Sequence, residues 1–329
     1  MPTMSQGSGE FMGKKVKRTF MQVYQEQAMY SQQELNNIFL TLKSLGMDEV
    51  ILQWTSYDDL NLYLFHSNNG RSVVTLPRII NAARLANIKL WLGTHFNSGF
   101  WGDLLLDDNI LKFKLDERIK EMDKRLSPLI STVDFVDEYH ETVIGWYISD
   151  EIDDENWNSE FRENLLIHYL SNLSLLLKQK VSHWPITISG FTNGEQKTPQ
   201  QLRKYWERIL LRTNISKLLF QDGIGAEKLD FDQLGQYLEE LKRITDIEPG
   251  NFGIITELFE SNEVNGKTVF NAASSERINR QIEISYSHST DLTIFSAPTY
   301  LLNHQIKNST KLFNKWSNST INANVNSNR

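Results

Sequence analysis

The stretch Gly145-Trp-Tyr-Ile-Ser-Asp-Glu-Ile-Asp-Asp154 begins as an apolar, strand-like run and ends in a cluster of carboxylates. A second segment of the same design, Gly253-Ile-Ile-Thr-Glu-Leu-Phe-Glu260, follows about a hundred residues later. Short apolar runs bounded by polar residues are typical of strands buried in a parallel sheet. Each segment therefore predicts a strand whose C-terminal end carries an acidic side chain.

Similar apolar runs alternate with amphipathic patterns along the whole chain. The predicted strands cover residues 17–24, 49–54, 89–96, 143–150, 185–191, 217–222, 252–258 and 292–297. The predicted helices cover residues 32–45, 76–86, 115–133, 160–180, 199–212, 232–244, 275–287 and 303–316. Eight strand-then-helix repeats without a glycine-rich phosphate motif favour a closed (β/α)8 TIM barrel of the α/β class over an open doubly wound sheet.

Length and composition restrict the class of protein. A chain of 329 residues can form one barrel domain. The net charge of −7 and the lack of a dense Lys/Arg block argue against a nucleic-acid or anionic-membrane partner. With no cysteine, disulfides and thiolate zinc sites are excluded. No apolar run reaches the roughly 18 residues of a membrane span.

The chain divides into three parts. Residues 1–13 end in a Gly-Ser-type spacer and resemble a leader left by an expression vector, which we expect to be disordered. Residues 14–317 are predicted to form the barrel as a single domain. Residues 318–329 are rich in Asn and Ser, so we predict a disordered tail.

The C-terminal strand ends are where barrel proteins place their active sites. Most of the predicted strand ends carry polar or aromatic side chains. The candidate substrate-binding residues at these ends are Gln22, Tyr24, Gln53, Trp54, His95, Asn97, Trp101, Asp150, Gln221, Asp222 and Tyr300.

Two carboxylates stand out among the strand ends. Period-two alternation puts Gly145, Tyr147, Ser149 and Glu151 on one face of the predicted strand and Asp150 on the other. Gly145 near the start of the strand and Glu151 at its C-terminal end suit a face that points into the barrel and opens into a pocket at that end. This favours Glu151 as the catalytic group. Glu257 follows an uncharged run, so burial would raise its pKa unless nearby donors stabilise the anion.

We expect those donors to Glu257 among Gln22, Gln53, Tyr24 and His95, on other strand ends. Two carboxyl groups facing one cavity are what glycosidic bond cleavage requires, since one protonates the leaving oxygen while the other attacks or activates water. Glu151 and Glu257 are therefore the predicted catalytic pair. A pair about 5 to 5.5 Å apart would retain the anomeric configuration, and a wider pair, at about 6.5 to 9.5 Å, would invert it.

Tryptophans near predicted strands suit a carbohydrate cleft, because aromatic rings pack on the flat faces of sugars. Trp54, Trp101 and Trp157 are candidate cleft residues, whereas Trp91 and Trp146 are predicted to pack in the core. We expect an oligosaccharide or polysaccharide partner, no metal and no organic cofactor. An alternative is a metal site assembled from His95, Glu151, Asp222 and Glu257, although no His-x-His or His-Glu-x-x-His motif is present.

With Asp150-Glu151 ending one strand and Glu257 another, the chain resembles the clan of retaining glycoside hydrolases built on TIM barrels. The phrases Thr19-Phe-Met-Gln22, Val50-Ile-Leu-Gln-Trp-Thr55 and Ile255-Thr-Glu-Leu-Phe259 resemble a bacterial barrel family linked to exopolysaccharide or surface-polysaccharide gene clusters. Clan members often carry Asn before the acid/base, where this chain has Asp150.

The resemblance implies that Glu151 is the general acid/base and Glu257 the nucleophile. It also implies a bacterial surface or extracellular polysaccharide as substrate and a periplasmic or extracellular location. The sequence is also compatible with two other functions. One is a metal-dependent barrel hydrolase or isomerase, and the other is a non-catalytic carbohydrate-binding barrel in polysaccharide assembly.

Overall fold

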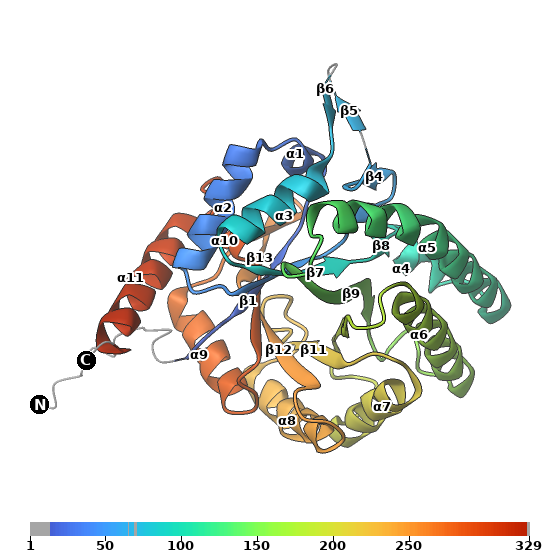
Figure 1. Cartoon of the computed structure of the whole chain (residues 1–329). Coiled ribbons are helices and arrows are strands. Elements are labelled where there is room, and N and C mark those ends of the chain that lie inside the picture. Colours follow the sequence, from blue (N-terminus) through green and yellow to red (C-terminus); the bar gives the residue numbers. More distant parts are fainter. Residues whose placement is uncertain (1–13, 65, 69–70, 328–329) are drawn as a thin grey trace, which may run out of the picture.

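Eight parallel strands close into a barrel, as the sequence predicts (Figure 1). The computed structural model describes residues 14–64, 66–68 and 71–327. The barrel strands follow the order β1-β15-β12-β11-β10-β9-β7-β2. Their bounds are β1 Arg18–Met21, β2 Glu49–Leu52, β7 Lys89–Gly93, β9 Val143–Ile152, β10 Ile186–Gly190, β11 Lys217–Gln221, β12 Phe252–Glu257 and β15 Leu292–Phe295. Each corresponds to one predicted strand, and the fold class is confirmed.

Long helices surround the barrel (Figure 1). Their bounds are α2 Gln32–Ser44, α3 Thr75–Leu85, α5 Asp108–Val136, α6 Glu160–Lys180, α7 Pro199–Arg212, α8 Phe231–Leu241, α9 Ser275–Tyr286 and α11 Ser309–Ser327. Side-chain oxygens of Ser31, Thr198 and Asp230 cap the N-termini of α2, α7 and α8. Asp107 caps α5, which therefore begins seven residues before the predicted 115.

Large side chains fill the barrel interior. This inner cluster consists of Phe20, Ile51, Trp91, Tyr147, Leu219 and Ile255. On β9, Tyr147 points inward, whereas Trp146 and Ile148 pack in the outer core toward the helices. Gly145 makes room for the inner cluster, because a β-carbon there would lie 2.4 Å from the Trp91 ring. The alternation predicted for this strand is therefore present.

Short elements that the sequence patterns did not predict follow several barrel strands. The short helices are α1 Gln25–Ala28, α4 Phe100–Asp103 and α10 Ala297–Tyr300, and the 3-10 helix η1 Lys242–Asp246 follows α8. The additional strands are β3 Ser56–Tyr57, β4 Leu60–Asn61, β5 His66–Asn68, β6 Arg71–Val73, β8 His95–Phe96, β13 Phe259–Val264 and β14 Lys267–Ala272. The elements α1, β3, β8, β13 and α10 directly follow barrel strands and therefore lie on the C-terminal side of the barrel, whereas η1 continues α8 and leads to β12.

The expectation of a disordered tail from residue 318 is wrong for residues 318–327, which belong to α11. Leu312 and Trp316 are buried earlier in this helix, and a helix that is anchored in this way extends at little further cost. The expected leader at 1–13 lies outside the described residues, as do 328–329. In the part of the chain that the structure describes, no helix combines the length and apolarity needed to cross a membrane.

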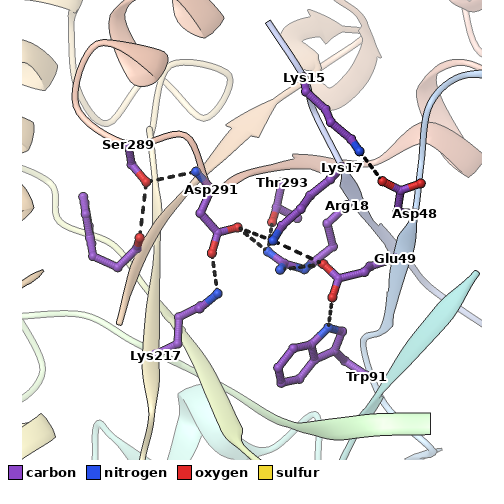
Figure 2. Close-up of polar contacts among 11 residues, drawn as sticks. Lys15, Lys17, Arg18, Asp48, Glu49, Trp91, Lys217, Ser289, Asp291 and Thr293 are labelled. Carbon is purple, nitrogen blue, oxygen red and sulfur yellow. Dashed lines mark hydrogen bonds and ion pairs between the residues drawn. The ribbon is translucent and has the colours of Figure 1, made fainter. Parts of the chain in front are cut away.

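A charged network closes the N-terminal end of the barrel (Figure 2). Arg18 of β1 is 1% exposed and forms ion pairs with Glu49 of β2 at 2.7 Å and with Asp291, just before β15, at 2.8 Å. Lys217 of β11 pairs with Asp291, and the Trp91 indole N–H donates to Glu49 at 3.2 Å. Despite its burial, Asp291 has a pKa lowered to about 2 by Arg18 and Lys217.

Asp291→Asn should destabilise the protein by about 3 kcal/mol, because it leaves the buried Arg18 and the partly buried Lys217 short of a countercharge. The depressed pKa of Asp291 means that its contribution is present above the unfolded-state value of 3.8 and is lost as the pH falls toward about 2. Urea unfolding at neutral and acidic pH measures both effects. The difference between wild type and variant should therefore shrink at acidic pH.

Asp59→Asn provides the control, because Asp59 is exposed and its carboxylate makes no hydrogen bond or ion pair in the described part of the chain. It should change stability by less than about 0.5 kcal/mol. Equal stability of Asp291→Asn and Asp59→Asn at neutral pH would contradict a structural role for the network.

Candidate active site

The two predicted carboxylates, Glu151 on β9 and Glu257 on β12, line one cavity of about 200 Å³ at the C-terminal end of the barrel. Its floor includes Ile255 of the inner cluster. The complete lining is Phe20, Glu151, Ser189, Gln221, Ala226, Lys228, Ile255, Glu257, Phe259 and Phe295. Side chains from β1, β9, β10, β11, β12 and β15 therefore converge here, which only a closed barrel permits.

Glu151 lies on an irregular part of β9. Ile148 of β9 pairs with Ile188 of β10, and the next pair is Ile152 with Gly190. Between these two pairs β9 therefore has two more residues than β10, which makes a bulge. Such bulges re-aim side chains next to functional sites. Burial raises the pKa of Glu151, while the Lys228 charge and a hydrogen bond with Gln221 act in the opposite direction.

Glu257 is 3% exposed, and the loop after β11 holds it in place. The backbone N–H of Ala226 donates to Glu257 Oε2 at 3.0 Å. Gly225 permits this close approach, because a β-carbon there would lie 2.5 Å from the Phe259 carbonyl oxygen and 2.9 Å from the Glu257 side chain. The other oxygen of Glu257, Oε1, is buried and has no hydrogen-bond partner among the described residues.

Asp222 lies directly behind Glu257. Its carboxylate accepts hydrogen bonds from the Gln281 side chain at 2.8 Å and from the backbone N–H groups of Ile224 at 3.2 Å and Glu257 at 3.4 Å. These donors lower the pKa of Asp222, but burial outweighs them and raises it to about 6. Burial, followed by the Asp222 charge, raises the pKa of Glu257 well above its usual range, whereas Lys228 and the Ala226 N–H lower it. The pair therefore retains a proton to higher pH than an isolated carboxyl group would.

Lys228 is the site residue that sequence patterns missed. Its Nζ lies 3.4 Å from the centroid of the Phe191 ring, and its charge lowers the pKa of both Glu151 and Glu257. Phe191 in turn contacts Trp101, which is 36% exposed, with ring centroids 6.0 Å apart. A single lysine in a loop leaves no periodic signal, so only its position after β11 could have indicated it.

Asp150 faces away from this cavity, on the opposite side of β9. It accepts a hydrogen bond from the Tyr169 hydroxyl at 2.6 Å and lies 3.9 Å from Arg118. Together with His95 and Asn97 it lines a different cavity of about 300 Å³. The structure therefore separates three predicted substrate-binding residues from the carboxylate pair.

The predicted donors to Glu257 on other strand ends are not observed, and that expectation is wrong. The Nδ1 atom of His95 shares a hydrogen bond of 2.7 Å with Ser56, and burial lowers the pKa of His95 to about 4. Gln22 and Tyr24 line a groove on the outer side of β1, and Gln53 is buried with its Oε1 atom unpaired among the described residues. Backbone geometry in the β11 loop supplies the donor instead.

The candidate tryptophans are distributed differently from the prediction. Trp157 is fully buried in the outer core, so its assignment to a cleft is wrong. Trp54 is also buried, and its indole N–H donates to the Val23 carbonyl at 2.8 Å. Trp91 and Trp146 are both buried, as predicted. Only Trp101 offers an exposed ring near the Lys228 side of the site.

Other predicted site residues lie at or beside the cavity. Gln221 lines it, and Asp222 supports Glu257 from behind. Tyr300 is buried, with its ring centroid 5.5 Å from that of Phe259, which lines the cavity. Among the described residues, no three His, Asp or Glu side chains are grouped so that they could hold a metal ion, and His95 lies in another cavity.

Fold and site together define an α/β-barrel protein with two carboxyl groups in one cavity at the C-terminal strand ends. The family model described as "Domain of unknown function (DUF4434)" matches residues 16–304, and the chain belongs to this family. It is 31% identical over 227 residues to YbcH of Escherichia coli (strain K12), described as an uncharacterized protein, with 69% of this chain and 70% of YbcH covered.

Solved structures with this fold include glycoside hydrolases. A candidate alpha-L-fucosidase from Bacteroides thetaiotaomicron aligns with a TM-score of 0.72 and 19% identity, over 94% of this chain and 96% of the other. The endo-1,4-beta-mannanase from Rhizomucor miehei aligns with a TM-score of 0.60 and 12% identity, over 94% and 95%. At these identities the likeness is one of fold, and function must be argued from the site.

Asp222→Asn should lower the pKa of Glu257, because the substitution removes the negative charge that opposes ionisation while keeping the shape of the side chain. Ionised Glu257 should then persist to lower pH than in the wild type. A ¹³C NMR titration of the Glu carboxyl carbons, with Glu257 assigned by the signal lost in Glu257→Gln, measures the shift.

Asp232→Asn is the matched control, since Asp232 is exposed at the start of α8. It should leave the Glu257 titration unchanged. An unchanged or raised Glu257 pKa in Asp222→Asn would show that the two carboxyl groups are not coupled as described.

Proposed function

We propose that this protein is a glycoside hydrolase whose catalytic pair is Glu151 and Glu257. One observation carries the proposal: two carboxyl groups, of the partly buried Glu151 on β9 and the buried Glu257 on β12, line one small cavity at the C-terminal end of the barrel. Acid–base hydrolysis of a glycosidic bond needs two carboxyl groups on one site, with one proton between them. Burial raises the pKa of both groups, so this cavity holds a proton to higher pH than free carboxyl groups would.

We assign Glu257 as the nucleophile. The Ala226 N–H donates to its Oε2 and fixes the carboxyl group at the wall of the cavity that would hold the anomeric carbon. Burial and the Asp222 charge raise the pKa of Glu257 to about 8, and Lys228 and the Ala226 N–H oppose this shift. The positive charge that develops on the sugar ring in the transition state would also favour the carboxylate form. Asp222 acts as a positioning residue, because it contacts Glu257 from behind and does not line the cavity.

Glu151 then serves as the general acid/base. Its pKa is raised by burial, which keeps a proton available for the leaving oxygen, and its hydrogen bond with Gln221 orients the carboxyl group. After the leaving group departs, Glu151 would deprotonate the water that releases the sugar from Glu257, with net retention. The fold and the resemblance to polysaccharide-linked barrels support a bacterial surface or extracellular polysaccharide as substrate.

Glu151→Gln and Glu257→Gln should each reduce turnover by at least about 100-fold, because Gln can neither donate a proton nor attack. Release of reducing ends from a panel of bacterial polysaccharides and aryl glycosides measures activity, and circular dichroism checks the fold. Glu155→Gln is the control, since Glu155 is an exposed carboxylate on the same side of the barrel, bound to Asn193 at 2.8 Å. Near-normal activity in both active-site variants would refute the assignment.

Two further measurements separate the proposal from its rivals. Activity should survive chelator treatment, whereas a metal-dependent barrel enzyme should lose it. The first product seen by ¹H NMR should keep the anomeric configuration of the substrate, and inversion would reassign Glu257 as a general base. Glycan binding without any release of reducing ends would favour the non-catalytic carbohydrate-binding barrel.

A further inference from the structure

A groove of about 690 Å³, larger than the carboxylate cavity, lies on the outer side of β1. Its lining residues come from the end of β1, from α1, α2 and α10, and from the segment 302–305. Its volume falls within the range of about 300 to 1,000 Å³ that is typical of small-molecule sites. The carboxylate cavity, at about 200 Å³, lies below that range.

The groove lining has the chemistry of a site for neutral, hydroxyl-rich ligands. Its polar groups are mainly amides, hydroxyls and phenols, and the lining contains no Lys or Arg. The ionisable groups other than tyrosine are Glu26, Glu34 and His304. Amide and hydroxyl groups can donate to and accept from sugar hydroxyls, whereas Glu26 and Glu34 would repel a carboxylate-bearing sugar.

Several groove groups have hydrogen-bonding capacity that the protein does not use. The side chains of Gln22 and Thr299 make no hydrogen bond within the described residues, although both line the groove. The Tyr24 ring is 45% exposed, and edge contacts with Trp54 at 5.1 Å and Tyr57 at 5.8 Å hold it in position. A rigid, half-exposed ring beside free amide and hydroxyl groups suits a sugar ring, which has one apolar face and a polar rim.

The groove and the carboxylate cavity share two chain segments. Phe20 of β1 lines the cavity, whereas Met21 of β1 and Gln22, just after it, line the groove. Phe295, the last residue of β15, lines the cavity, whereas Thr299 of α10 lines the groove. The two sites are therefore adjacent along both segments.

Tyr300 lies between the two sites. Its ring packs against Phe259 of the cavity, and the pKa of its hydroxyl is raised to about 12 by burial and by the charges of Glu257 and Tyr24. The Tyr300 hydroxyl is thus within electrostatic range of one residue from each site.

We propose that this groove binds the continuation of a neutral glycan chain whose scissile sugar lies between Glu151 and Glu257. The inference rests on the proposed function and adds the substrate class: an uncharged oligosaccharide longer than the carboxylate cavity can hold. Binding in the groove supplies interaction energy away from the reacting bond, so that short substrates are hydrolysed less well than long ones.

Binding is tested in the inactive Glu257→Gln protein by isothermal titration with chitohexaose, cellohexaose, mannohexaose and hexagalacturonate. We expect at least one neutral hexasaccharide to bind and hexagalacturonate to bind at least tenfold more weakly. Gln22→Ala and Thr299→Val should each weaken the neutral ligand by about threefold to tenfold, the effect of losing one hydrogen bond. Gln200→Ala, an exposed residue on α7, is the matched control and should change nothing.

The proposal is overturned if no neutral hexasaccharide binds, if hexagalacturonate binds as tightly, or if the Gln22→Ala/Thr299→Val double variant binds like the control. Turnover by the otherwise wild-type protein separates this failure from that of the proposed function. If long and short substrates are cleaved equally well by wild type and double variant, only the groove assignment fails. If glycans bind in a Gln22-dependent and Thr299-dependent way but are never cleaved, only the hydrolase assignment fails.

Discussion

The barrel depends most directly on the ion pairs that the buried Arg18 forms with Glu49 and Asp291. β1 and β15 close the ring, yet their ladder pairs only Arg18 with Thr293 and Thr19 with Ile294. Arg18 strengthens this short seam, because it joins Glu49 on one neighbouring strand to Asp291 before the other. A buried guanidinium requires paired carboxylates, so any other register would leave the charge unpaired at a high cost in free energy.

Closure at this end sets the geometry at the opposite end. The inner cluster fills the middle of the barrel and leaves Glu151 and Glu257 above it, facing one cavity. Low in the barrel, Asp291 is surrounded by cations and its pKa is lowered, whereas Glu257 is paired with another carboxylate and its pKa is raised. The same kind of group is therefore held as an anion at one end of the barrel and keeps a proton to higher pH at the other, a contrast that is common between structural and functional sites.

The C-terminal side of the barrel combines a small reactive cavity with a wide polar groove. Lys228, Ala226 and Asp222 come from β11 and its loop and control the ionisation of Glu257. Tyr24 and Thr299 come from segments that follow the first and last barrel strands, which closure has made neighbours. The catalysis that we propose for the carboxylate cavity and the glycan binding that we propose for the groove thus take place at the same end of the barrel.

The sequence by itself determined the strands, most helices and the two central carboxylates, because these follow from local periodicity. Strand parity separated Glu151 from Asp150, and the rule that barrel sites lie at C-terminal strand ends selected Glu257. Tertiary structure alone decided the partners of those groups: Lys228, the Ala226 N–H and the coupling of Asp222 with Glu257 depend on how one loop folds back over another strand. It also decided that His95 and Asp150 share a separate cavity and that residues 318–327 continue a helix, because contacts between segments distant in sequence leave no periodic signal in the chain.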